Sequence, residues 1–187
     1  MAESQHERFV FLNCPLDAEY RPLFEAIVFA VQDCGYVVKC ALEFEDGSEI
    51  RIEKISRLIA SCRLGIHDIS RTELDIDTEL PRFNMPFELG LFFGAKRFGR
   101  GIQKLKNCLI LDTERYRYQK FISDIAGQDI AAHRRRPDEA IAVVRNWLSN
   151  LTPRSIAIPS GAVIEERYAS FRIELPALCT QLHLRPN

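Results

Sequence analysis

The chain has 187 residues, which is enough for one α/β domain with a full core and too few for two large domains. Its 25 basic residues nearly balance its 26 acidic residues, so we expect no dedicated nucleic-acid surface. No apolar run approaches the roughly 20 residues of a membrane span, and the N-terminal residues lack the apolar core of a signal peptide. We therefore expect a cytoplasmic protein without a membrane partner.

Short apolar runs bounded by turn residues predict buried strands at about 8–13, 36–42, 63–69 and 107–111. Apolar residues that recur every three or four positions predict helices at about 19–34, 49–62, 84–96, 116–126 and 139–151. This alternation predicts an α/β fold with a parallel sheet. We expect a flavodoxin-like strand order of about 2-1-3-4, with the first strand inside the sheet and helices on both faces.

The end of the chain has a different pattern. Residues 152–160 contain two prolines and have the composition of a linker. An apolar stripe with helical spacing then runs from Ile164 to Leu182. We therefore expect an α/β domain over residues 1–151, followed over residues 152–187 by a linker and a C-terminal helical extension. This extension should dock on the domain or on a second copy.

The six cysteines are scattered, without a CxxC pair or a companion histidine at metal-binding spacing. A domain of this size needs no disulfide bonds, so we expect reduced cysteines that mostly serve as small core residues. We expect no metal site and no bound cofactor. Cys14 stands apart from the others because it directly follows a predicted strand.

The most informative predicted helix begins at Asn84, a residue type that suits the N-cap. Residues 85–95 are apolar on every side of a helix, which predicts that the helix is buried all round. Gly90 and Gly94 are expected to let it approach the sheet closely. Glu88 is the one charge in this segment. A buried carboxylate needs a partner, a raised pKa or a chemical task, although the helix dipole also favours an acid near a helix N-terminus.

Ligands of open α/β sheets bind beyond the carboxyl ends of the strands, near the point where the strand order reverses. Residues 13–17, residues 68–71 and the start of the Glu88 helix should converge there. We expect Glu88 to be the catalytic residue of this pocket. The residues expected to bind substrate beside it are Asn13, Cys14, Pro15, Leu16, Asp68, Ser70, Arg82 and Asn84.

Some of these residues have a second interpretation. Asp68 either orients a ribose hydroxyl or caps the following turn. Arg71 and Arg82 either contact a phosphate or are surface residues without a binding role. We expect His67 to be a core histidine and residues 133–136 (HRRR) to form a solvated face.

No Walker loop, GxGxxG, HExxH or GxSxG motif is present, which argues against the commonest ATPase, dehydrogenase, metalloprotease and hydrolase sites. A carboxylate pocket at the head of an α/β sheet remains. Such a carboxylate can attack the sugar, or stabilise an oxocarbenium-like centre, during cleavage of a glycosidic bond. The N-terminus of the Glu88 helix can hold a phosphate.

Three segments, taken in order, resemble nucleoside 2-deoxyribosyltransferases: residues 11–16 (FLNCPL), Asp68, and residues 87–90 (FELG). In that family the Glu of the E-L-G segment is the nucleophile that takes the deoxyribosyl group. Residues 82–94 (RFNMPFELGLFFG) are more similar still to bacterial TIR-like nucleotide-binding proteins, which carry an R-x-N-V-x-x-E-L-G-x-F-x-G segment. The resemblance covers about residues 8–112.

This resemblance implies that Glu88 is catalytic and that NAD or another nucleotide is the substrate. Members of the TIR-like family cleave NAD at the nicotinamide ribosidic bond, often in antiphage defence. Two alternatives remain: a nucleoside 2-deoxyribosyltransferase or nucleoside hydrolase, and a nucleotide sensor or TIR-like assembly module without turnover. The resemblance also implies a homo-oligomer.

Overall fold

The computed structural model describes residues 5–42, 48–75 and 78–184. In this part of the chain the strands form one sheet, in which every neighbouring pair is parallel. The strands are β1 (Phe9–Asn13), β2 (Val37–Lys39), β3 (Leu64–Asp68), β4 (Asn107–Asp112) and β5 (Ile130–Ala132). Their order is β2-β1-β3-β4-β5, which confirms the predicted parallel α/β sheet with β1 inside it.

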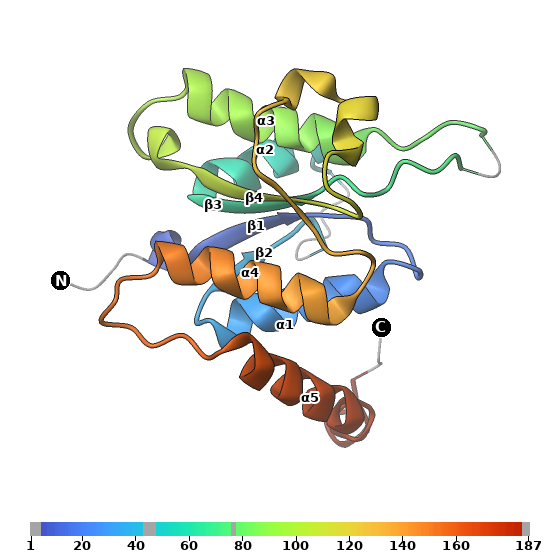
Figure 1. Ribbon diagram of the computed structural model, residues 1–187, viewed down its shortest axis with the longest axis vertical. Coiled ribbons are helices and arrows are strands. Elements are labelled where there is room, and N and C mark those ends of the chain that lie inside the picture. The colour runs from blue at the N-terminus through green and yellow to red at the C-terminus, as the bar shows by residue number, and fades with distance from the viewer. Residues whose placement is uncertain (1–4, 43–47, 76–77, 185–187) are drawn as a thin grey trace.

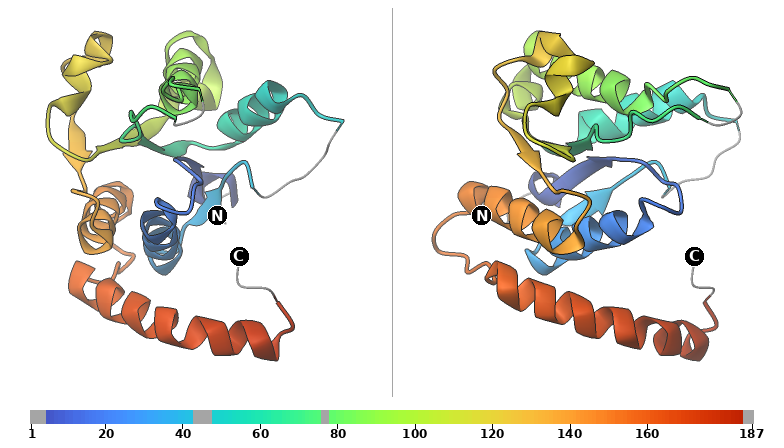
Figure 2. Two further views of the ribbon diagram at one scale, coloured as in Figure 1. Left: turned by 90° about the vertical axis from the view of Figure 1, so that its right-hand side faces the viewer. Right: turned by 45° about the vertical axis from the view of Figure 1, so that its right-hand side comes forward.

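Helices cover both faces of this sheet (Figure 1). One face carries α2 (Arg51–Ser61) and α3 (Asn84–Phe98), and the other carries α1 (Arg21–Asp33) and α4 (Pro137–Leu151). A further helix, α5 (Gly161–Gln181), lies outside α1 and α4 (Figure 2). Every residue of β3 is buried, because the strand is covered on both faces.

A glycine in a strand sets the distance between α3 and the sheet. A Cβ atom on Gly65 of β3 would lie 2.8 Å from the Phe92 ring of α3 and 2.9 Å from Nε2 of His67. Phe92 is fully buried, and its ring meets the His67 ring edge-on at a centroid distance of 4.8 Å. The close approach was predicted from Gly90 and Gly94, and this prediction is wrong: Cβ atoms there would meet open space.

The prediction that α3 is buried all round is also wrong. Glu88, Leu89 and Phe92 are its buried residues, whereas Phe83 and Phe87 are exposed. The outer side of α3 stays open because no further layer covers it in the described chain. Asn84, the predicted N-cap, is the first helical residue instead, and Phe83 occupies the N-cap position.

The helix predicted at 116–126 does not form. Two short 3₁₀ helices, η3 (Arg117–Lys120) and η4 (Ser123–Ile125), occupy that region. Tyr116 has a left-handed φ of 65°, and Gly127 closes the segment at φ 95°. The strand β5 follows and was not predicted, because its three residues, Ile-Ala-Ala, are too few to show a period.

The C-terminal extension docks through the first half of its apolar stripe. Ile164 and Tyr168 are buried in the core that α1 and α4 share with the sheet. Tyr168 Oη also donates a hydrogen bond to the carbonyl oxygen of Pro22 at 3.2 Å. Near the end of α5 Cys179 is buried, whereas Leu178, and Leu182 just beyond the helix, are exposed. None of the helices formed by the described residues is long and apolar enough to cross a membrane.

We expect Ile164→Ala to lower the free energy of unfolding by about 2–5 kcal/mol, because the substitution leaves a cavity where a fully buried side chain packed. The matched control is Ile173→Ala in the same helix, where the side chain is 80% exposed. It should change the stability by less than about 0.5 kcal/mol. Urea unfolding measures both variants, and equal effects would contradict the docking of α5.

Candidate functional site

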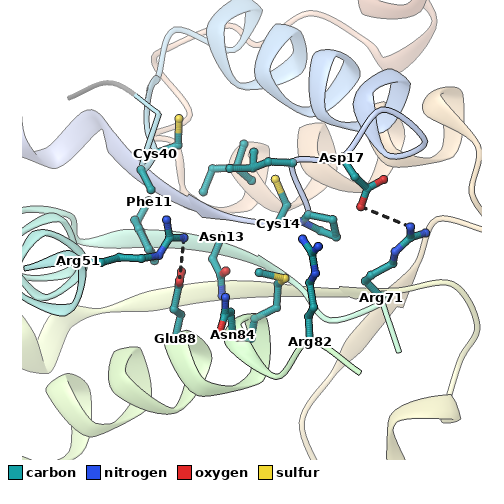
Figure 3. Close-up of a pocket in the computed structure, with 15 residues that line it drawn as sticks. Phe11, Asn13, Cys14, Asp17, Cys40, Arg51, Arg71, Arg82, Asn84 and Glu88 are labelled. Atoms are coloured by element: carbon teal, nitrogen blue, oxygen red, sulfur yellow. Dashed lines mark hydrogen bonds and ion pairs between the residues drawn. The ribbon is translucent and has the colours of Figure 1, made fainter. Parts of the chain in front are cut away.

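A cleft of about 450 Å³ opens at the carboxyl ends of β1 and β2, between the N-terminal ends of α2 and α3 (Figure 3). This is the edge of the sheet at which the sequence analysis expects a ligand to bind. The predicted site residues that the cleft brings together are Asn13, Cys14, Pro15, Leu16, Arg82, Asn84 and Glu88. Their binding to a substrate stays a prediction.

Glu88 lies on the buried side of α3 and lines this cleft. The residue is only 6% exposed, and within the described chain no hydrogen bond reaches its carboxylate. Arg51, at the start of α2, faces it with Nη2 3.9 Å from Oε1 (Figure 3). Burial raises the pKa of Glu88, and the positive charge of Arg51 opposes the increase. The carboxylate therefore lies in a poorly solvated position with little compensation for its charge.

The packing of α3 brings Glu88 to the cleft. Glu88 precedes Phe92 by four residues, so both side chains share one side of the helix. Phe92 is anchored against Gly65, and this contact turns the Glu88 side of the helix toward β1. One turn earlier, Asn13 Nδ2 donates a hydrogen bond to the carbonyl oxygen of Met85 at 2.9 Å. The end of β1 is thus joined directly to the first turn of α3.

Asn13 is also hydrogen-bonded to the side chain of His67, the residue beside it on the adjacent strand β3. Asn13 Nδ2 lies 3.1 Å from His67 Nδ1. Burial, with a smaller contribution from Lys106, lowers the pKa of His67 to about 3. His67 is therefore neutral near pH 7, so its Nδ1 can accept the bond from the amide. Its full burial confirms the prediction of a core histidine.

Three arginines line the cleft: Arg51, Arg71 and Arg82. Arg71 donates a hydrogen bond to Glu19 at 2.7 Å and approaches Asp17 at 3.5 Å. Arg82 lies 3.2 Å from Asp75. The N-terminal ends of α2 and α3 border the same space and add partial positive charge. Asp17 and Glu88 line the cleft as well, so each of the three arginines faces an acidic side chain, and an anionic ligand has to compete with these ion pairs.

The thiol of Cys14 does not suit nucleophilic chemistry. Cys14 is buried in the wall of the cleft. Burial, followed by the nearby charge of Asp68, raises the pKa of this thiol well above its usual value. The thiolate is the reactive form of cysteine, so a raised pKa leaves the side chain unreactive near neutral pH.

Asp68 does not line the cleft, and its predicted place beside Glu88 is wrong. Successive residues of a strand point to opposite faces, so Asp68 points away from the face that His67 occupies. Its carboxylate is fully buried, accepts a hydrogen bond from Tyr20 Oη at 2.5 Å and lies 3.0 Å from His133 Nε2. Burial and the Asp68 charge raise the pKa of Tyr20, which keeps this phenol protonated.

Ser70 is placed in the same separate region. Its backbone N–H donates to Asp68 Oδ1 at 2.8 Å, so the turn-capping interpretation of Asp68 is confirmed. Ser70 lines a second hollow of about 240 Å³, on the α1 side of the sheet, together with Tyr20 and His133. The expected pairing of Ser70 with Glu88 in one pocket is therefore wrong.

Sequence reasoning also missed the places of His133, beside Asp68 in the separate region, and of Arg51, in the cleft. His133 was assigned to a solvated face, but it is fully buried and only the following arginines are exposed. Because β5 was not predicted, nothing in the sequence HRRR indicated that His133 follows a strand. Arg51 was missed as a neighbour of Glu88. Its place at the start of a predicted helix, on the ligand edge of the sheet, was the available signal.

Among the described residues, no group of three or more His, Cys, Asp or Glu side chains is arranged to hold a metal ion. No family model matches the chain, and no curated protein sequence matches it. The assignment of a function therefore depends on the geometry of the cleft and on the residues that form it.

The raised pKa of Glu88 predicts a gain in stability on removal of its charge. The folded protein keeps the Glu88 proton to a higher pH than the unfolded chain does, so ionisation of Glu88 destabilises the fold as the pH rises. Glu88→Gln should therefore raise the melting temperature at about pH 7.5, and the gain should shrink as the pH falls to about 4, where the carboxyl is mostly protonated in both states.

The matched control is Glu174→Gln, because Glu174 is exposed on α5, outside the cleft. Differential scanning calorimetry at both pH values should show no such pH-dependent gain for this variant. If Glu88→Gln lowers the melting temperature at about pH 7.5, the carboxylate is better compensated than the structure indicates.

Proposed function

We propose that the protein is a nucleotide-binding enzyme of the N-glycosidase type that cleaves the bond between base and ribose, with NAD as its substrate. One observation carries this proposal: a buried carboxylate without a hydrogen-bond partner in the described chain lines a cleft with three arginines. The resemblance of residues 82–94 to TIR-like nucleotide-binding proteins supports it. The same resemblance favours a cytoplasmic, self-associating protein that acts in antiphage defence.

In this proposal Glu88 faces C1′ of the nicotinamide ribose. The C1′–N bond breaks and its electron pair leaves with the nitrogen, so the cationic nicotinamide becomes neutral. Positive charge then develops on the sugar, and the Glu88 carboxylate stabilises it or bonds to C1′. Water adds at C1′ and loses a proton, which gives ADP-ribose; where Glu88 has bonded to C1′, this step also breaks that bond and returns its electron pair to the carboxylate. The low dielectric around Glu88 strengthens its attraction to the developing charge.

The arginines support the choice of a phosphorylated substrate, whose phosphates would replace the acidic partners of Arg71 and Arg82. A pyrophosphate carries two negative charges near the sugar, and Arg71 and Arg82 both line the cleft that holds Glu88. Arginine binds phosphate oxygens through a planar set of N–H donors. A plain nucleoside has no group that would use these charges. This favours NAD over the substrates of a nucleoside hydrolase or deoxyribosyltransferase.

The contact between Arg51 and Glu88 favours one alternative, a nucleotide-binding module without turnover. In that case the pair at 3.9 Å would serve only to offset a buried charge. The two functions differ in a measurable way, because only an enzyme releases the free base.

Glu88→Gln keeps the volume of the side chain and removes its negative charge. We expect turnover of NAD to fall roughly 100-fold or more, because the charge acts on the transition state. The affinity for NAD should fall less than turnover, because the positive charge lies on the nicotinamide ring in the bound substrate and moves to the sugar beside Glu88 only as the bond breaks. Chromatographic detection of the free base, with NAD, NADP and nucleosides as substrates, measures turnover.

Glu174→Gln is the control and should retain the wild-type rate, because Glu174 lies outside the cleft. A folded Glu88→Gln protein that releases nicotinamide as fast as the wild type would refute the catalytic role of Glu88. Saturable binding of NAD without base release by the wild type would support the binding module instead.

A further inference from the structure

The orientation of the Asn13 side-chain amide is fixed by its two neighbours. The carbonyl oxygen of Met85 can only accept a hydrogen bond, so the amide nitrogen of Asn13 must face it. The second hydrogen of that nitrogen is directed at Nδ1 of the neutral His67. Both donors of the amide are therefore used inside the protein, and the position of its oxygen follows from them.

Within the described residues, the amide oxygen is left without a partner. Asn13 is only 2% exposed, and its Oδ1 is a buried atom that accepts no hydrogen bond from this part of the chain. Buried polar atoms in proteins are nearly always paired, and an unpaired one costs stability. Asn13 also lines the cleft, and Figure 3 places it in the middle of the lining, between the Cys14 loop and α3. An unpaired acceptor at this place indicates a ligand that brings a donor.

The second acceptor group of the cleft is Glu88, which faces Arg51 at 3.9 Å. An ionised Glu88 can only accept hydrogen bonds, and within the described chain its carboxylate receives none. Two acceptors in one cleft match a ligand with two neighbouring hydroxyl groups. A ribose carries such a pair at C2′ and C3′, and the 2′-hydroxyl is attached next to the reacting C1′.

We propose that Asn13 Oδ1 accepts a hydrogen bond from the 2′-hydroxyl of the substrate sugar, so that Asn13 makes the cleft selective for ribosides over 2′-deoxyribosides. This inference rests on the proposed function, because it places C1′ of the sugar at Glu88. It assigns Asn13 two tasks. The amide nitrogen holds the first turn of α3 in place, and the amide oxygen distinguishes a sugar with a 2′-hydroxyl from one without it.

The physical basis of the selectivity is the cost of leaving the oxygen unpaired. A riboside satisfies Oδ1, whereas a 2′-deoxyriboside buries it without a donor. Sites built to bond a substrate hydroxyl discriminate strongly against the analogue that lacks it, because the buried protein group is then left unpaired. The selectivity should therefore disappear when the oxygen is removed.

The test compares NAD with the NAD analogue whose nicotinamide ribose lacks the 2′-hydroxyl, on the wild type and on Asn13→Ala. The two compounds differ in intrinsic lability, but this difference cancels because both enzymes act on the same pair. We expect the ratio of the two kcat/KM values, riboside over deoxyriboside, to be about 10-fold lower in Asn13→Ala. Loss of the bond to Met85 would slow both compounds equally and leave the ratio unchanged.

Cys40→Ala, a substitution in another wall of the cleft, is the matched control and should keep the wild-type ratio. Calorimetry adds a readout without turnover. The affinities of both compounds are compared for Glu88→Gln with and without Asn13→Ala. The same 10-fold loss of preference is expected there.

Turnover by the wild type with an unchanged ratio in Asn13→Ala would overturn the role of Asn13 and leave the proposed function intact. A preference in binding that depends on Asn13, without turnover of either compound, would support this role and refute the enzyme. If the Asn13→Ala protein does not fold, the test uses the Glu88→Gln protein, which retains Asn13. Equal affinity of Glu88→Gln for the two compounds would overturn the inference.

Discussion

The position of the candidate site depends on the contact between Phe92 and Gly65. A side chain on Gly65 would collide with the Phe92 ring, so only glycine lets α3 come this close to β3. The ring in turn packs edge-on against His67, which is bonded to Asn13, and Asn13 is bonded to Met85 at the start of α3. This chain of contacts joins β1, β3 and α3, and it fixes the helix that carries Glu88.

The same packing gives Glu88 its electrostatic character. A carboxylate on the outer side of α3 would be solvated, as the exposure of Phe83 and Phe87 there indicates. On the inner side it has lost most of its water, and its pKa is raised. Arg51 offsets part of this cost at 3.9 Å. Active sites often keep such unfavourable arrangements, which reduce stability in return for reactivity.

Strong local patterns made most of the fold predictable. The apolar strands and the amphipathic helices around β1, β3 and β4 were long enough to show their period, and parallel order followed from their alternation. The strand β5 and the 3₁₀ helices near Tyr116 were not predictable, because short elements show no period. The left-handed backbone conformation of Tyr116 cannot be predicted from the residue type either.

The candidate site was predictable where it follows from the end of a strand or the start of a helix, as for Asn13, Arg82 and Glu88. The prediction failed where the position of a side chain depends on which face of the sheet it points to. Asp68 follows His67 directly, and this single step moves its carboxylate to the opposite side, toward Tyr20 and His133.

The most direct test of the central claim is a crystal structure of the Glu88→Gln variant with NAD. The account predicts NAD in the cleft, with C1′ of the nicotinamide ribose facing position 88. NAD outside the cleft, or with its glycosidic bond turned away from position 88, would contradict it.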